Sequence, residues 1–229
     1  MQYKFGAPIT HTEETVMNDK RISVKIDRMY NRKSLYYDSK KMGNVLIIGG
    51  SNNYRKDIIK NIIVEILSKY HSRNISFIIL SPNSSGYDNL SEEYNSIELY
   101  QDEKLFHEKM KDLMMIKESR LLFLDETFIK KHAKLIGPER IARIREIRKK
   151  NSFDNYFVII DDCNYIFDWW EFIFDFKRLF SDSSKANINL ILITNGCWGL
   201  GEQNESIVMS VIDSKIVLDK GEKDDQTIL

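Results

Sequence analysis

Cysteine, net charge and long apolar stretches are all scarce in this chain of 229 residues, and each shortage excludes a class of protein. The two cysteines, Cys163 and Cys197, cannot build a disulfide framework, which points to a reducing compartment. The 34 basic residues balance the 34 acidic ones, so the domain as a whole is not a polyanion-binding protein. Any basic surface must be local.

No apolar run approaches the length that crosses a bilayer; one of the longest is Phe157-Val158-Ile159-Ile160. The first residues, Met1 to Phe5, lack the apolar centre of a signal peptide. The four histidines are scattered, and no cysteine–histidine spacing indicates a zinc site, so we expect no metal centre of that kind. These features predict a cytoplasmic domain, which reaches a membrane only if a longer protein carries a separate anchor.

Apolar runs alternate with helical patterns from residue 44 onward. Residues 44–48 form a continuous apolar run that predicts a strand buried on both faces, and isoleucines then recur at helical spacing. Further strands are predicted at residues 75–80, 97–100, 156–162, 189–195 and 214–218, with a long charged helical region at 104–150 and an aromatic-rich helix from about 168. This order predicts an α/β fold with a mostly parallel, doubly wound sheet and helices on both faces.

The N-terminal part has a different pattern. Residues 1–20 are polar and irregular and are predicted to be a lead-in or linker. Residues 21–27 alternate polar and apolar, which predicts a half-exposed strand, and residues 33–38 predict another. We therefore expect a folded domain over residues 21–229, with an extra strand or hairpin at its start.

The turn after the first buried strand occupies the place of a P-loop, in which a glycine-rich turn and a helix N-terminus cradle phosphates. When the segment is aligned with the pattern G-x-x-x-x-G-K-[ST], Gly49 falls on the first glycine position and Tyr54 falls on the second. Arg55 takes the lysine position and Lys56 the hydroxyl position. The candidate nucleotide segment is Gly49, Gly50, Ser51, Asn52, Asn53, Tyr54, Arg55 and Lys56.

Each departure from the pattern has a physical consequence. Tyr54 puts a ring where backbone must approach phosphate closely. Arg55 keeps a positive charge on a broad planar head instead of a compact ammonium. Lys56 replaces a magnesium-ligating hydroxyl with a cation that repels the metal.

A second acidic element follows the strand predicted at residues 156–162. Asp161 stands where P-loop enzymes hold magnesium, and Asp162 stands in place of the glutamate base, one methylene shorter. Considered alone, Asp161 and Asp162 fit equally well as ordinary acidic residues at the end of a buried strand, without a role in magnesium binding. Together with the glycine turn, in this order, they favour the P-loop class. We also expect Arg55 or Lys56 to form an ion pair with Asp161 or Asp162.

The sequence resembles FtsK/SpoIIIE ATPases at four places. Residues 44–63 look like their strand, loop and helix, and residues 156–166 resemble their acidic strand. Residues 188–195 are similar to their I-H-L-I-L-A-T-Q strand, with Asn195 at the glutamine, and the final residues 225–229 echo their S-R-T-I-L. The most similar group is the last ATPase domain of type VII secretion coupling proteins (the EssC/EccC group).

This resemblance implies a RecA-like P-loop fold in a membrane-anchored secretion protein. Its partners would be neighbouring ATPase domains and secreted substrate proteins. The family's arginine before the I-H-L-I-L-A-T-Q strand is replaced, since Ser183-Ser184 stand there. We therefore expect a degenerate domain that hydrolyses ATP very slowly or not at all, with no bound ATP or magnesium. The alternatives are an active ATPase motor that drives protein secretion, and a DNA-translocase module.

Two further features bear on partners. Trp170 and Phe174 lie four residues apart on one side of the aromatic helix, and either cover a second core patch or contact a partner. Trp198 is a similar candidate. The basic run at residues 140–150 is interleaved with isoleucines every three residues, so an amphipathic helix with a solvated basic side is favoured over nucleic-acid binding.

Overall fold

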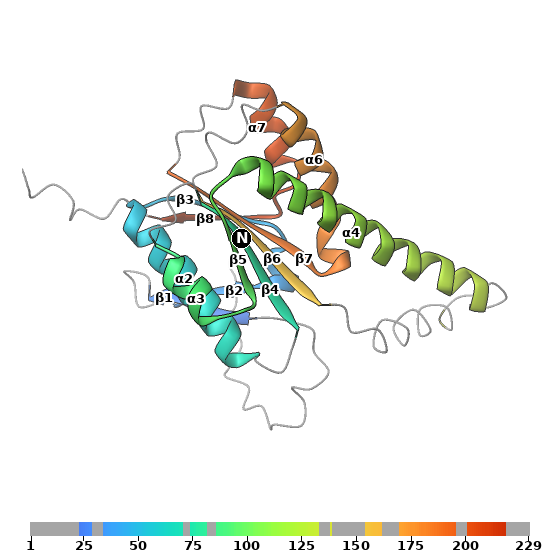
Figure 1. The fold of residues 1–229 in the computed structure, drawn as a ribbon, viewed down its shortest axis with the longest axis horizontal. Helices are drawn as coiled ribbons and strands as arrows, with labels where there is room; N and C mark the ends of the chain where they lie inside the picture. Colours follow the sequence, from blue (N-terminus) through green and yellow to red (C-terminus); the bar gives the residue numbers. More distant parts are fainter. Residues whose placement is uncertain are drawn as a thin grey trace, which may run out of the picture.

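The computed structural model describes residues 23–28, 34–70, 74–81, 86–132, 138, 154–161, 170–195 and 201–218. The strands are β1 (Ser23–Arg28), β2 (Ser34–Asp38), β3 (Val45–Gly49), β4 (Ile75–Leu80), β5 (Ile97–Tyr100), β6 (Asn155–Asp161), β7 (Ile188–Thr194) and β8 (Ser214–Leu218). The helices are α1 (Ser39–Met42), α2 (Asn52–Lys69), α3 (Asp88–Glu93), α4 (Glu103–His132), α6 (Trp170–Phe180), the 3-10 helix η3 (Ser183–Ala186) and α7 (Gly201–Met209). Figure 1 shows their arrangement.

Six strands form one parallel sheet in the order β5-β4-β6-β7-β3-β8. The chain leaves β3 through α2 and enters β4, which lies on the far side of β7 and β6. The carboxyl ends of β3, β4, β6 and β7 therefore share one edge of the sheet, where ligands bind in open α/β folds. The predicted α/β class with a doubly wound parallel sheet is confirmed.

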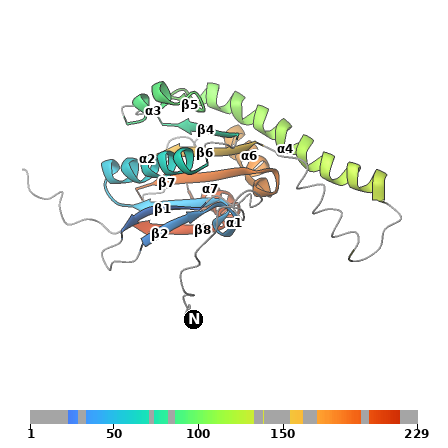
Figure 2. The ribbon, with the colours of Figure 1, turned by 90° about the horizontal axis from the view of Figure 1, so that it is seen from below.

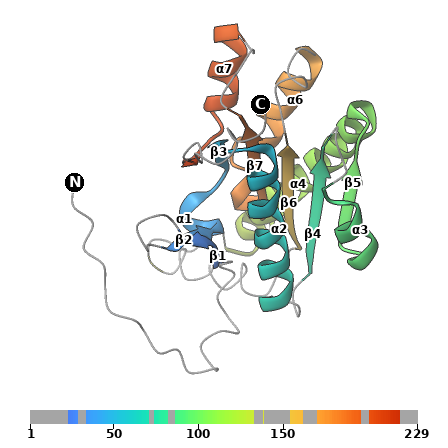
Figure 3. The same cartoon turned by 90° about the vertical axis from the view of Figure 1, so that its left-hand side faces the viewer.

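Alternate residues of each central strand enter two separate cores, one on each face of the sheet. Helix α2 covers one face together with α3, while α4, α6 and α7 cover the other (Figure 3). On β3, Leu46 faces the α4–α6–α7 side, whereas Val45 and Ile47 face α2. Burial on both faces is the reason why these strands are continuous apolar runs in the sequence.

The N-terminal strands β1 and β2 pair antiparallel in a small separate sheet, and β1 lies beside α2. Tyr37 of β2 is 1% exposed and meets the ring of Phe157 edge-on, with centroids 6.1 Å apart. This contact fastens the small sheet to the α2 side of the domain, so the predicted extra hairpin is part of the core.

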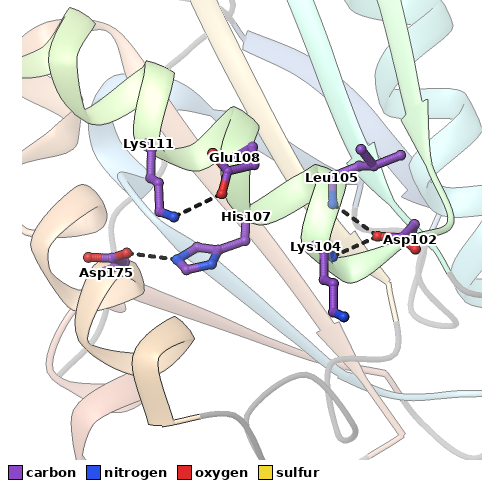
Figure 4. A network of polar contacts seen from close by, with 7 residues as sticks. All are labelled: Asp102, Lys104, Leu105, His107, Glu108, Lys111 and Asp175. Carbon is purple, nitrogen blue, oxygen red and sulfur yellow. Dashed lines mark hydrogen bonds and ion pairs between the residues drawn. The ribbon is translucent and has the colours of Figure 1, made fainter.

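A side-chain contact joins the start of α4 to the middle of α6 (Figure 4). His107 Nε2 lies 2.7 Å from Asp175 Oδ2, and the side chain of Asp102 caps α4 by accepting from the amides of Lys104 and Leu105. Figures 1 and 2 show that α4 continues past the sheet. Its last described buried residue is Arg120, which donates to the carbonyls of Asp154 and Ala186.

The sequence located most elements closely. The bounds predicted for β4, β5 and β8 agree with the structure, and those for β3, β6 and β7 are shifted by one residue. In α6, the aromatic-rich helix that the sequence predicts, Phe172, Ile173 and Phe176 are buried in the core. Helices α1, α3, η3 and α7 were not predicted. Residues 1–20 and the basic run at 140–150 lie outside the described residues.

Within the described part of the chain, no helix combines the length and the apolar composition needed to span a membrane.

Candidate functional site

The glycine turn at the end of β3 is held in a shape that only glycine adopts readily. Gly49 has φ +89° and Gly50 has φ +69°, both in the left-handed region. A Cβ on Gly49 would lie 2.5 Å from the carbonyl oxygen of Leu218 on neighbouring β8. The two glycines are therefore required by backbone conformation and by the close approach of β8, independently of any ligand.

Helix α2 starts sooner than the P-loop pattern requires. Ser51 is its N-cap, and its hydroxyl accepts a hydrogen bond from the amide of Tyr54 at 3.3 Å. Asn52 and Asn53, which the pattern places in the loop, are the first two helical residues. Only Gly50 and Ser51 remain between strand and helix, so the turn is much tighter than a phosphate-wrapping loop.

Tyr54 lies across this turn. Its ring carbon Cδ1 is 3.1 Å from the position that a Cβ of Gly50 would take, and the side chain is 39% exposed. The ring therefore covers the glycine turn on the side where a P-loop leaves its backbone open.

Arg55 points back into the turn. Its side chain is 5% exposed, and Nη1 donates to the carbonyl of Gly50 at 2.6 Å and more weakly to that of Gly49 at 3.4 Å. Its Nε is buried without a hydrogen-bond partner among the described residues. The guanidinium group donates hydrogen bonds to these loop carbonyls, and the expected pairing of Arg55 or Lys56 with Asp161 or Asp162 stays a prediction.

Lys56 is also buried, with 7% exposed, and runs along the segment that precedes α3. A Cβ on Gly86 would lie 2.7 Å from Lys56 Cδ, so the lysine stem packs directly on the glycine backbone. The Nζ atom lies 5.9 Å from the centroid of the Tyr87 ring, within the range of a cation–π contact. Pairing of Lys56 with Asp161 or Asp162 stays a prediction.

Asp161 is the last residue of β6 and is 2% exposed. Its Oδ2 accepts hydrogen bonds from the hydroxyl of Tyr87 at 3.1 Å and from that of Ser81 at 3.4 Å. Burial and the adjacent charge of Asp161 raise the pKa of Tyr87 far above its ordinary value, so the phenol stays protonated and serves as donor.

The structure brings the glycine turn, Arg55, Lys56 and Asp161 to the same edge of the sheet, as the sequence predicted. Asn195 directly follows β7 at that edge and is exposed. Asp162 and Trp198 lie outside the described residues, as does the side chain of Trp170. Phe174 is 59% exposed on α6, so it does not cover a second core patch.

Ser81 and Tyr87 were missed by the sequence reasoning. Ser81 could have been found, because it follows β4, and β4 and β6 are parallel neighbours whose ends meet. Tyr87 has no local pattern that indicates its role; it is the N-cap of α3 and reaches Asp161 across the fold.

No group of three or more metal-ligating side chains is found in the described segments. This finding covers histidine, cysteine and acidic residues.

No protein-family model and no curated protein matches the sequence. Solved structures do share its fold. ATPases 2 and 3 of EccC from Thermomonospora curvata, in complex with a signal sequence peptide, match with TM-score 0.64 and 16% identity over 94% of this chain and 36% of that chain. ATPases 2 and 3 of EssC from Geobacillus thermodenitrificans match with TM-score 0.61 and 13% identity over 97% of this chain and 42% of that chain.

The pCW3 conjugation coupling protein TcpA, in its monomer form with ATPγS, also matches, with TM-score 0.58 and 13% identity over 90% of this chain and 57% of that chain. The chain thus spans less than two thirds of each of these matched chains. At such identities the likeness establishes the fold alone, a RecA-like α/β fold that this chain shares with these structures.

Proposed function

We propose that this chain is a degenerate FtsK/SpoIIIE-like ATPase domain of a type VII secretion coupling protein. It acts through contacts with neighbouring ATPase domains and with secreted substrate proteins, and it hydrolyses little or no ATP. The fold shared with EccC and EssC ATPase domains supports the first part. The seating of Arg55 in the glycine turn is the observation that carries the second.

A P-loop lysine must extend toward the β- and γ-phosphates while the loop amides surround them. Arg55 is buried instead, and its 2.6 Å hydrogen bond to Gly50 holds the guanidinium group on the inner side of the turn. Extending this side chain toward a phosphate would break its part-buried hydrogen bond to the Gly50 carbonyl, and a hydrogen bond from a charged group contributes about 1.5–3 kcal/mol. Nucleotide binding must overcome this cost.

The helix N-terminus offers little to compensate. The amide of Tyr54 is directed to the Ser51 hydroxyl and that of Arg55 to the Ser51 carbonyl. Both donors are thus used within the first turn of α2. The Tyr54 ring also covers Gly50, where phosphate would need close access to the backbone.

The residues at the metal position also fit magnesium poorly. Mg²⁺ takes oxygen ligands in octahedral geometry and usually keeps several waters. Lys56 supplies a cation at the hydroxyl position, and Asp161 is 2% exposed. In the folded chain Asp161 instead accepts hydrogen bonds from Tyr87 and Ser81, and Lys56 lies against Gly86 and the Tyr87 ring.

Isothermal titration calorimetry with Mg-ATP tests the proposal. We expect no saturable binding below about 1 mM, which corresponds to a binding free energy weaker than about 4 kcal/mol. Asp161→Asn is the matched control, because binding that survives it lies elsewhere on the chain. Micromolar binding by the wild type that Asp161→Asn weakens would overturn the proposed degeneracy.

Phosphate release by the full-length, assembled protein distinguishes the active-motor alternative. Turnover that is lost on Asp161→Asn in this domain alone would establish an active site here and refute the proposal. Turnover that persists in this variant belongs to other domains and agrees with it.

A further inference from the structure

We infer that Asp161 is the anchor of an internal cluster that replaces the magnesium site, with Tyr87 and Ser81 as hydroxyl donors and Lys56 as a tethered cation. This inference deepens the proposed function and rests on it: the site is filled from within by the chain's own side chains. The domain then needs neither metal nor nucleotide to complete the carboxyl edge of its sheet.

The first argument is the environment of Asp161. Its Oδ2 already receives hydroxyl hydrogen bonds from β4 and from the start of α3, at 3.4 Å and 3.1 Å. A metal ion at this oxygen would compete with these two donors. Because the residue is 2% exposed, a hydrated ion cannot approach without moving the side chains that cover it.

The second argument is that Tyr87 links the carboxylate to the lysine. Its hydroxyl contacts Asp161, while the face of the same ring lies 5.9 Å from Lys56 Nζ. Tyr87 is fully buried, so its contacts with Asp161 and Lys56 are made in a region of low dielectric, where electrostatic interactions are strong. One side chain thus connects a buried anion with a buried cation that come from β6 and α2.

The third argument is the route of the Lys56 side chain. Its stem packs on Gly86, where a Cβ would come within 2.7 Å of Cδ, and Gly86 directly precedes Tyr87. The lysine is 7% exposed, so its charge is not simply solvated at the surface. A tethered ammonium at the position of the magnesium-binding hydroxyl supplies positive charge without the entropy loss of capturing an ion, and it repels Mg²⁺.

Thermal unfolding of the full chain with and without millimolar MgCl₂, in the absence of nucleotide, tests the cluster. We expect the wild-type Tm to be the same in both conditions. The variant Tyr87→Phe/Lys56→Ser removes one donor and the cation and restores a hydroxyl, so its Tm should be lower than wild type and should rise with MgCl₂. Tyr100→Phe/Lys60→Ser is the matched control. The Tyr100 hydroxyl also donates to a carboxylate, but that carboxylate is Glu98 on β5, and Lys60 lies one turn further along α2 than Lys56.

A wild-type Tm that rises with MgCl₂, with the rise abolished by Asp161→Asn, would overturn the inference. A double variant with unchanged Tm and no magnesium response would overturn it as well. If the double variant does not fold, Mn²⁺ binding to the wild type followed by electron paramagnetic resonance decides: no binding supports the cluster, and binding lost on Asp161→Asn refutes it.

The outcomes separate this inference from the proposed function. Magnesium binding without ATP binding refutes the internal cluster and leaves the degenerate domain standing. Conversely, tight ATP binding in the presence of EDTA, with no response to magnesium, refutes the degenerate domain and leaves the replacement of the metal by Lys56 standing.

Discussion

Substitution of Asn44 should destabilise the domain strongly, because this one side chain makes four hydrogen bonds to four different segments. Asn44 precedes β3 and is 3% exposed. Its Nδ2 donates to the carbonyls of Phe180 and Val211, each at 2.9 Å. Its Oδ1 accepts from the amide of Leu190 at 3.0 Å and from the hydroxyl of Ser183 at 3.3 Å. One amide group therefore joins the strand that delivers the glycine turn to α6, η3, β7 and the segment after α7.

Asn44→Ala leaves three backbone groups without their partners: two carbonyls and one amide. At about 1–2 kcal/mol for each group, the expected loss in free energy of unfolding is about 3–6 kcal/mol. That is a large fraction of the total stability of an ordinary domain, about 5–15 kcal/mol. Asn44→Asp keeps the side-chain size and the acceptor oxygen, but it places a second oxygen against the carbonyls of Phe180 and Val211 where Nδ2 donated. Its loss in free energy of unfolding should therefore be at least as large as that of Asn44→Ala.

Urea unfolding followed by circular dichroism measures both variants by linear extrapolation. Asn61→Ala, on the exposed side of α2, serves as control and should change the free energy of unfolding by no more than about 0.5 kcal/mol. A loss below about 1 kcal/mol for Asn44→Ala, with an unchanged m-value, would refute the reasoning that these hydrogen bonds hold the elements together.

Two further predictions concern α4 and α6. Lys117 Nζ donates to the carbonyls of Arg178 at 2.6 Å and Ser181 at 2.5 Å, so Lys117→Met should lower the free energy of unfolding by about 1–3 kcal/mol. Burial lowers the pKa of Lys117 in the folded state, so the unfolded state binds this proton more tightly. The difference in free energy of unfolding between wild type and Lys117→Met should therefore widen as pH rises toward the ordinary lysine pKa. Urea unfolding at several alkaline pH values measures this difference, and a difference that narrows would contradict the prediction. Phe174→Ala should weaken binding to the proposed partners, a neighbouring ATPase domain or a secreted substrate protein, by about 1–2 kcal/mol in calorimetry. Met115→Ala, exposed to a similar degree on α4, is the control, and equal affinities for both variants would exclude Phe174 from the contact.

The fold was readable because a parallel sheet buries both faces of its strands. Such strands cannot alternate polar and apolar residues, so the central strands β3, β4, β6 and β7 stand out as uninterrupted or nearly uninterrupted apolar segments between turns. The helical spacing of the isoleucines likewise fixed which side of α2 is buried. Local composition decides these features, since each follows from what a segment must cover.

The start of α2 was harder to predict. The P-loop pattern places Asn52 and Asn53 in the loop, and this placement agrees with the weak helix propensity of asparagine. In the structure both residues are helical and Ser51 caps them. Ser51 is a favoured N-cap residue, which is the one local indication of the earlier start.

The sequence by itself indicated that a glycine turn, two cations and an acid-ended strand lie at one edge of a parallel sheet, because buried strands that alternate with helices run parallel and end at the same edge. Only the tertiary structure decided how these charges are used. Arg55 turns back to the carbonyl of Gly50, and Tyr87, distant in sequence from Asp161, delivers its hydroxyl to that carboxylate. The direction of a long side chain depends on donors and acceptors that other segments supply, and no local pattern contains that information.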